Sequence, residues 1–62
     1  MTNQEKEKIL KFLKEQRVVT SSEIAKFLGV SWNTAQGYLM ELALDRDITR
    51  IKKDGVNLWL PN

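Results

Sequence analysis

GVSWNTAQGYLMELA, residues 29–43, predicts a tight turn followed by a helix with two distinct faces. Gly29 takes a positive φ without steric cost, and a glycine in this conformation commonly ends the preceding helix. Ser31 is a favoured N-cap, because its side-chain oxygen accepts a hydrogen bond from a free amide of the first helical turn. The period of about 3.6 residues that follows predicts a helix over about residues 32–45.

The two faces of this predicted helix differ in chemistry. The apolar face consists of Ala35, Leu39 and Leu42, and we expect it to lie against the core. The other face carries Asn33, Gln36, Gly37 and Met40. Amide side chains pair with adenine edges in the major groove of DNA, at about 1–3 kcal/mol of discrimination each. The pattern favours a recognition helix; the alternative is an ordinary solvated face.

Composition narrows the classes of protein and of site. A chain of 62 residues forms one domain, near the lower size limit for folding alone, because so small a domain buries only ~60% of its surface. It has no Cys and no His, so disulfides, thiolate zinc sites and catalytic cysteines are excluded, and we expect no metal or cofactor. Met1 precedes polar residues, and no run approaches the ~20 apolar residues of a membrane span. We expect a cytoplasmic protein without a membrane partner.

Charge permits a nucleic-acid partner without demanding one. The net charge of +2 comes from ten basic and eight acidic residues. Residues 1–17 carry five basic and three acidic groups, and residues 45–62 carry four and three. The middle segment, which contains the predicted recognition helix, carries one basic and two acidic groups. Positive charge therefore lies at the two ends of the chain.

Two further helices precede the glycine turn. Thr2 or Asn3 caps the first, which should end near Gln16 or Arg17. Residues 18–20 form either a brief strand or a simple link, and Ser21 or Ser22 then caps a second helix over residues 23–28. We expect the core to consist of Ile9, Leu10, Leu13, Ile24, Ala25, Leu28, Val30, Ala35, Leu39, Leu42, Ile48 and Leu58.

The last segment predicts a hairpin. Asp54-Gly55 is a strong signal for a two-residue turn between strands over residues 48–53 and 56–60. A turn of this length pairs residue 53 with 56, 51 with 58 and 49 with 60. The alternation of side chains then directs Val56, Leu58 and Leu60 towards the core. Trp59 would share the outer face with Arg50, where a cation–π contact is possible.

The order helix, helix, turn, helix, hairpin resembles the winged helix-turn-helix domain of bacterial and archaeal transcriptional regulators. The likeness covers nearly the whole chain and rests on residues 20–25 (TSSEIA), 28–31 (LGVS), 34–35, 38–39, 42 and the hairpin around 54–55. It implies an α+β, mainly α fold of three helices with a C-terminal two-stranded wing. It also implies sequence-specific binding of double-stranded DNA, as in a transcriptional regulator.

The resemblance assigns roles to particular residues. Residues just after the turn, and one turn later, reach the major groove; here they are Trp32, Asn33, Gln36 and Gly37. Ser31 and Thr34 would lie near phosphate. Apart from the resemblance, we expect Tyr38 to be half in the core, with its hydroxyl towards solvent or a phosphate. The wing tip, with Lys52, Lys53, Asp54 and Gly55, would touch the phosphate backbone or the minor groove.

The sequence departs from the family pattern in ways that bear on affinity. A basic residue is common at the position of Gly37, yet residues 31–45 contain no Lys or Arg. Relatives usually place Gly where the third helix ends, whereas Asp45, Arg46 and Asp47 stand here, so a left-handed residue would be strained. Few basic residues imply few phosphate contacts. Useful affinity would then need a second copy, a tandem site or a larger assembly.

Other functions remain as alternatives. The same fold could serve as a protein-interaction module, with Phe27, Trp32, Met40 or Leu44 as exposed anchors; for Trp32 we favour partial burial against the second helix. A basic rim around the third helix and wing favours DNA, and an apolar patch there favours a protein. RNA binding has no support from stacking aromatics on a sheet. Asp45, Asp47 and Asp54 lie in turns, and the chain has no His, no Cys and no glycine-rich phosphate loop, so we expect no catalysis. No small-molecule effector is evident.

Overall fold

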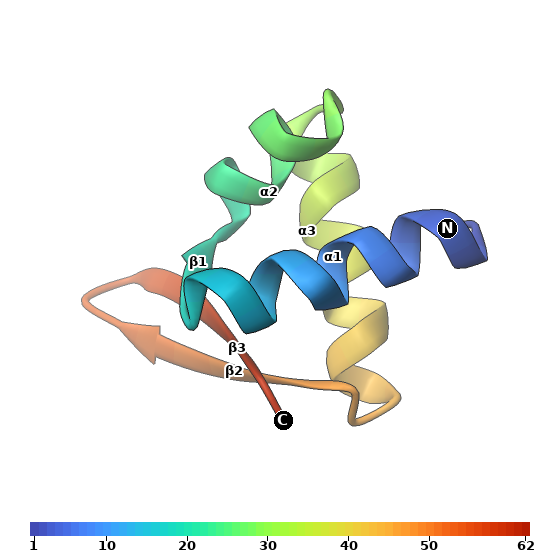
Figure 1. Cartoon of the computed structure of the whole chain (residues 1–62). Coiled ribbons are helices and arrows are strands. Elements are labelled where there is room, and N and C mark those ends of the chain that lie inside the picture. Colours follow the sequence, from blue (N-terminus) through green and yellow to red (C-terminus); the bar gives the residue numbers. More distant parts are fainter.

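Three helices and a three-stranded antiparallel sheet make up the computed structural model, which describes all 62 residues of the chain (Figure 1). In chain order the elements are α1 (Asn3–Gln16), β1 (Val19–Thr20), α2 (Ser21–Leu28), α3 (Trp32–Leu44), β2 (Ile48–Lys53) and β3 (Val56–Pro61). The predicted class, an α+β fold of three helices with a C-terminal hairpin, is confirmed. None of the helices is long and apolar enough to cross a membrane.

The first two helices begin with the same capping device. Thr2 and Glu5 form a capping box at the start of α1, and Thr20 and Glu23 form another at the start of α2. The cap of α1 is therefore one of the two predicted residues. The predicted start of α2 is wrong, because the T-x-x-E spacing makes Thr20 the cap and places both serines that follow inside the first helical turn.

A three-residue turn joins α2 to α3. Gly29 has φ 70° and ψ 35°, the left-handed conformation that the sequence predicts. Ser31 caps α3 and its hydroxyl accepts from the amide of Thr34 at 3.2 Å, also as predicted. The far end of α3 has no glycine, and Arg46 takes the left-handed conformation with φ 64°. A non-glycine residue there costs about 1–2 kcal/mol, which is the strain expected of this segment.

The hydrophobic core lies between the helices and the sheet. Its ten buried apolar residues are Ile9, Leu13, Val19, Ile24, Ala25, Ala35, Leu39, Leu42, Ile48 and Trp59. Eight of them are in the predicted core. The other four predicted core residues (Leu10, Leu28, Val30 and Leu58) are half-buried. Val19 and Trp59 are core residues that the sequence pattern does not predict.

The hairpin has the predicted register but the opposite facing. Arg50 pairs with Trp59, and Asp54 and Gly55 form the turn with φ 52° and 79°. Trp59 is fully buried, however, whereas Val56 is 49% exposed. The predicted outer position of Trp59 is therefore wrong, and so is the inward position of Val56.

The third strand explains this reversal. β1 pairs with β3, Val19 opposite Trp59, so the strand order is β1-β3-β2 and β3 lies in the centre of the sheet. The face that carries Trp59 is covered by the helices. Arg50, at the sheet edge, places Nη1 3.6 Å from the sulfur of Met40 on α3. The predicted cation–π contact with Trp59 is absent.

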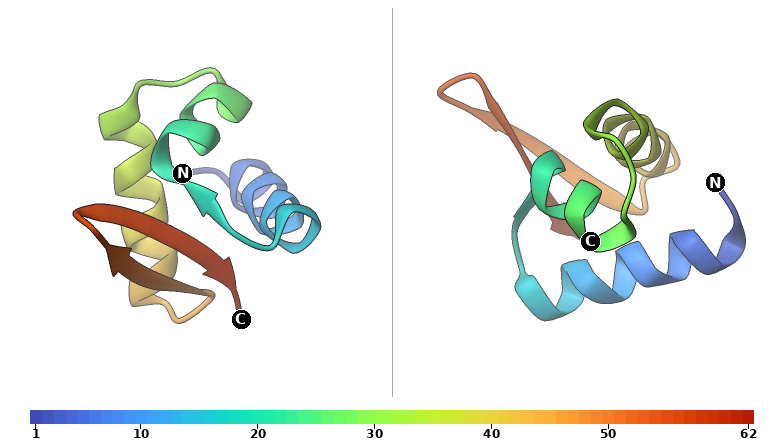
Figure 2. Two further views of the ribbon diagram at one scale, coloured as in Figure 1. Left: turned by 90° about the vertical axis from the view of Figure 1, so that its left-hand side faces the viewer. Right: turned by 90° about the horizontal axis from the view of Figure 1, so that it is seen from above.

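The helix-turn-helix and the hairpin share one side of the molecule. Seen from above, α1 lies along one side, and α3 and the tip of the β2–β3 hairpin lie on the other (Figure 2, right). An ion pair between Lys6 Nζ and Asp47 Oδ2, 3.1 Å apart, joins α1 to the segment after α3. In the view from above, no other helix lies on the side of α3 away from α1 (Figure 2, right).

Candidate nucleic-acid interface

The amphipathic character of α3 is confirmed. Ala35, Leu39 and Leu42 are fully buried, whereas Asn33 and Gly37 are exposed. An added Cβ at Gly37 meets no atom within 4 Å, so the backbone of α3 is open to approach there. The first half of the helix therefore presents a polar surface interrupted by a position without a side chain.

Gln36 lies on the same side of α3 as Asn33 and Gly37, but its side chain is hydrogen-bonded to the interior of the protein. Its Oε1 accepts a hydrogen bond from the hydroxyl of Ser21, the first residue of α2. The same hydroxyl accepts from Trp59 Nε1 at 3.0 Å. Ser21 is only 4% exposed, so this hydroxyl belongs to the interior. The sequence carries no signal for these contacts, because they join residues 15 and 38 positions apart.

The start of α3 presents two hydroxyls. Ser31 Oγ donates to Thr34 Oγ1 at 2.9 Å while it accepts the Thr34 amide. Ser31 is exposed and Thr34 is half-buried. They stand at the positive end of the helix dipole, which favours an anion such as a phosphate.

A shallow depression connects α3 to the wing. It is lined by Thr20, Ser21 and Ser22 at the start of α2, by Trp32, and by Gly55, Val56 and Asn57 of the wing. Trp32 is 50% exposed, so the indole forms part of this surface and is only partly buried. Asn57 Oδ1 is buried without a hydrogen-bond partner. The start of α3 and the wing tip are thus parts of one continuous surface.

The basic residues of this surface come from β2. Lys52 and Lys53 are exposed and lie at the end of β2, beside the turn of the wing. Arg50, also exposed, lies next to Met40 of α3 and was not among the residues predicted for this surface. The sequence predicts Arg50 on an outer face with Trp59; in the structure the two share the face that the helices cover, where Arg50, on the edge strand, remains exposed. Arg50 therefore extends the basic edge from the wing towards α3.

Tyr38 faces a different neighbour. Its hydroxyl donates to Glu5 Oε2 at 3.4 Å, so the half-buried ring connects α3 to the start of α1. Desolvation of the phenol, together with the nearby Glu5 charge, raises the pKa of Tyr38. The hydrogen bond from the backbone amide of Thr2 lowers the pKa of Glu5, with a smaller lowering from Tyr38. The predicted half-core position of Tyr38 is confirmed, but its hydroxyl points to Glu5 and not to solvent or a phosphate.

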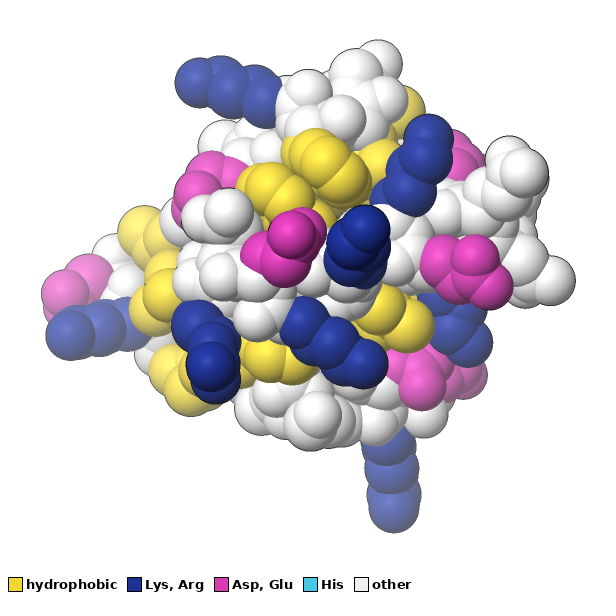
Figure 3. All heavy atoms as spheres, viewed as in Figure 1, with side chains coloured by type: hydrophobic (Ala, Val, Ile, Leu, Met, Phe, Trp, Pro, Cys, Tyr) yellow, Lys and Arg dark blue, Asp and Glu magenta, His cyan; other side chains and the backbone are white.

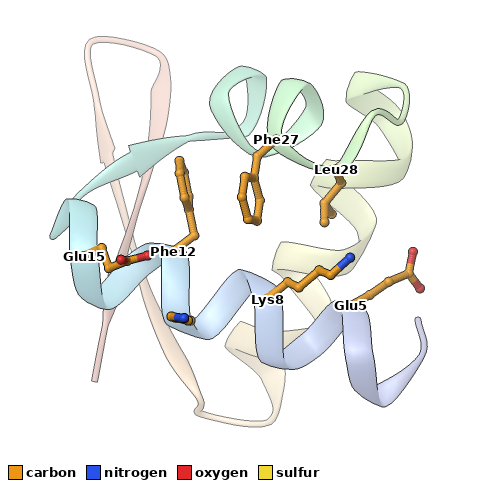
Figure 4. Close-up of a pocket in the computed structure, with 7 residues that line it drawn as sticks. Glu5, Lys8, Phe12, Glu15, Phe27 and Leu28 are labelled. Carbon is orange, nitrogen blue, oxygen red and sulfur yellow. The ribbon is translucent and has the colours of Figure 1, made fainter.

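The proposed protein-binding anchors do not form one patch. Phe27 stacks on Phe12 with ring centroids 4.2 Å apart, and both line a groove between α1 and α2 (Figure 4). Hydrophobic atoms of this region lie between basic and acidic side chains (Figure 3). Trp32 belongs to the separate depression beside the wing. Met40 is half-buried, contrary to its predicted exposure, and Leu44 is 80% exposed at the end of α3.

Comparison with protein families gives one match. The family described as FaeA-like protein matches residues 5–59, which is nearly the whole chain and covers α2, α3 and most of α1 and of the wing. No curated protein matches the sequence.

Proposed function

The chain belongs to the FaeA-like protein family, and we propose that it binds double-stranded DNA sequence-specifically, as a transcriptional regulator. In this proposal α3 enters the major groove and the wing lies on the flanking backbone. One observation carries it: the exposed amide-bearing half of α3 and the lysine-bearing wing tip belong to one surface, joined by the depression at Trp32.

Each group on this surface has a task that its chemistry suits. Asn33 is exposed and reads a base edge through its amide. Gly37 allows the helix backbone to come close to the DNA. Ser31 and Thr34, at the positive end of α3, lie against a phosphate. Trp32 contacts a sugar or a thymine methyl group at the edge of the groove.

The wing supplies the charge that α3 lacks. Lys52 and Lys53 bind phosphates at its tip, and Arg50 binds one nearer the helix. Such a small set gives modest affinity to a single copy. A second copy of the chain, a tandem site or another bound protein then supplies the remaining affinity. No catalytic step, cofactor or small-molecule effector is part of this proposal.

Selection from a random pool of duplex DNA at low salt tests the proposal. We expect enrichment of a short motif and expect Asn33→Ala to relax it at one position, because that amide reads a base. Gln4→Ala, which removes an exposed amide from α1, is the matched control and should leave the motif unchanged. Uniform weak binding that Asn33→Ala does not alter would contradict base reading by α3.

A protein-interaction module is the second candidate function. Leu44, 80% exposed, favours it, as does the absence of basic residues on α3. The separation of Phe27 from Trp32 argues against a single apolar docking patch. Failure of the selection experiment would favour this second function.

A further inference from the structure

Three side chains from three elements form one chain of hydrogen bonds. Trp59 Nε1 on β3 donates to Ser21 Oγ on α2 at 3.0 Å, and that hydroxyl donates to Gln36 Oε1 on α3. Trp59 is fully buried and Ser21 is 4% exposed, whereas Gln36 is half-buried. The chain therefore runs from the core to the edge of the reading surface.

The direction of this chain is determined by its inner end. An indole N–H is only a donor, so Ser21 Oγ must accept from Trp59. The proton of the Ser21 hydroxyl then needs an acceptor, and Gln36 Oε1 is its only one in the structure. The opposite amide orientation would turn the NH₂ group of Gln36 towards Ser21 and leave a buried hydroxyl proton unpaired, which is strongly disfavoured.

The outward chemistry of Gln36 is therefore not that of a free glutamine. Its carbonyl oxygen accepts from Ser21 with one of its two lone pairs, which turns this oxygen towards the protein, and the Nε2 amino group is the part of the amide turned outward. Bidentate pairing with adenine requires the carbonyl and the amino group to face the base together, since the carbonyl accepts from N6 and the amino group donates to N7. Guanine instead presents two acceptors, N7 and O6, and has no donor at that edge.

We propose that the Trp59–Ser21–Gln36 hydrogen-bond chain makes Gln36 a donor-only reader that selects guanine over adenine in the major groove. The inference rests on the proposed function, because it names the base that this helix reads. Gln36 is the specificity-determining residue. Ser21 and Trp59 are positioning residues, which act only by setting the orientation of the Gln36 amide.

The orientation of the amide can be tested without DNA. The Nε2 protons of Gln36 should exchange with water nearly as fast as those of Gln16, an exposed glutamine on α1, in side-chain amide NMR spectra. The indole proton of Trp59 should be strongly protected. Slow exchange of the Gln36 Nε2 protons would mean that the amino group faces inward and would overturn the inference, whatever the protein binds.

The base preference is tested by selection and by binding to matched duplexes. Wild type should prefer guanine to adenine by about tenfold at one position, within the range of a good base contact. Ser21→Ala frees the amide to rotate, so the preference should fall to within about twofold. Ser21→Thr restores the hydroxyl and should restore the preference. Gln16→Ala, which removes an exposed amide from α1, is the control and should leave the preference unchanged.

A second variant covers the case in which Ser21→Ala does not fold. Gln36→Glu keeps an acceptor for Ser21 but presents an acceptor outward, so guanine should be lost and cytosine, through its N4 donor, enriched. Circular dichroism confirms that each variant is folded. Wild-type selection of adenine at the position that Gln36 reads would overturn the inference and leave the proposed function intact. Absence of any sequence preference would overturn both.

Discussion

The two tryptophans of this chain have opposite surroundings. Trp59 is fully buried in the core and hydrogen-bonded through its indole N–H, whereas Trp32 is half-exposed beside the wing. An aromatic ring stabilises the fold in proportion to the apolar area that it removes from water. Trp59 therefore stabilises the fold, whereas the exposed half of Trp32 is available for contact with a ligand.

Trp59→Ala should abolish most of the stability of the domain. Truncating a buried tryptophan costs about 3–5 kcal/mol, and a domain of this size has a free energy of unfolding of only about 3–9 kcal/mol. Trp32→Ala is the matched control and should change it by less than about 1 kcal/mol. Urea denaturation followed by circular dichroism measures both. Equal effects of the two substitutions would contradict the assignment of Trp59 to the core.

Glu5 makes stability depend on acidic pH. The Thr2 amide, which donates to Glu5 Oε1 at 2.9 Å, lowers the pKa of this carboxyl below its ordinary value of about 4.3. A lowered pKa in the folded state contributes stability above the unfolded pKa, and this contribution is lost as pH falls through the folded pKa. Glu5→Gln keeps a capping-box partner but removes the charge.

The variant Glu5→Gln should therefore be less stable than wild type at pH 7, and the two should converge as the pH falls through the lowered pKa of Glu5. Urea midpoints at a series of pH values measure this difference. Glu15→Gln, at an exposed glutamate without a hydrogen bond, serves as the control and should show no such convergence. A difference that stays constant down to pH 2 would refute the charge effect.

Helix ends and interiors use glycine differently in this fold. Gly29 ends α2 with φ 70°, a conformation in which a side chain is strained. Gly37 lies inside α3, where a methyl group would meet no atom within 4 Å. A glycine in a helix interior lowers stability by about 1 kcal/mol relative to alanine. Retaining it on the reading face fits a need for close approach.

Substituting each glycine by alanine should change stability with opposite signs. Gly37→Ala should raise the free energy of unfolding by about 0.5–1 kcal/mol, and Gly29→Ala should lower it by about 1–2 kcal/mol. The stabilised Gly37→Ala variant should also bind DNA more weakly, because its methyl group stands on the reading face. Thermal unfolding and duplex titration measure these two effects. Unchanged affinity would show that the backbone at Gly37 does not approach the DNA.

Basic side chains lie on two different sides of the molecule. The basic residues of the proposed interface lie on β2, whereas Lys8 and Lys11 line the groove between α1 and α2 on another side. A net charge of +2 gives little long-range attraction, so local contacts decide the phosphate count. The salt dependence of DNA binding therefore reports which side faces the nucleic acid.

The slope of log affinity against log salt should be shallow, corresponding to fewer than about eight phosphates per chain. Lys52→Ala with Lys53→Ala should reduce its magnitude by about 2, since each phosphate contact contributes about 0.9. Lys8→Ala with Lys11→Ala removes the same charge from the α1 side and should leave the slope unchanged. Equal losses in the two double variants would mean that net charge, and not the wing, drives binding.

Features that depend on neighbours in the chain were predictable from the sequence. The Ser31 cap, the left-handed Gly29 and the Asp54-Gly55 turn each depend on residues within about four positions. The length of that turn also determines the register in which β2 and β3 pair. The order of the elements, the fold class and the amphipathic face of α3 follow from the same local rules.

Only the tertiary structure decided which face of the hairpin is buried and how the proposed DNA-binding surface is supported. Strand alternation defines two faces, but pairing with β1 and covering by the helices determine which one meets the core, and this places Trp59 inside. The contacts of Ser21 with Trp59 and with Gln36 span 38 and 15 positions. Such contacts depend on how separate elements pack, and no local pattern in the chain encodes them.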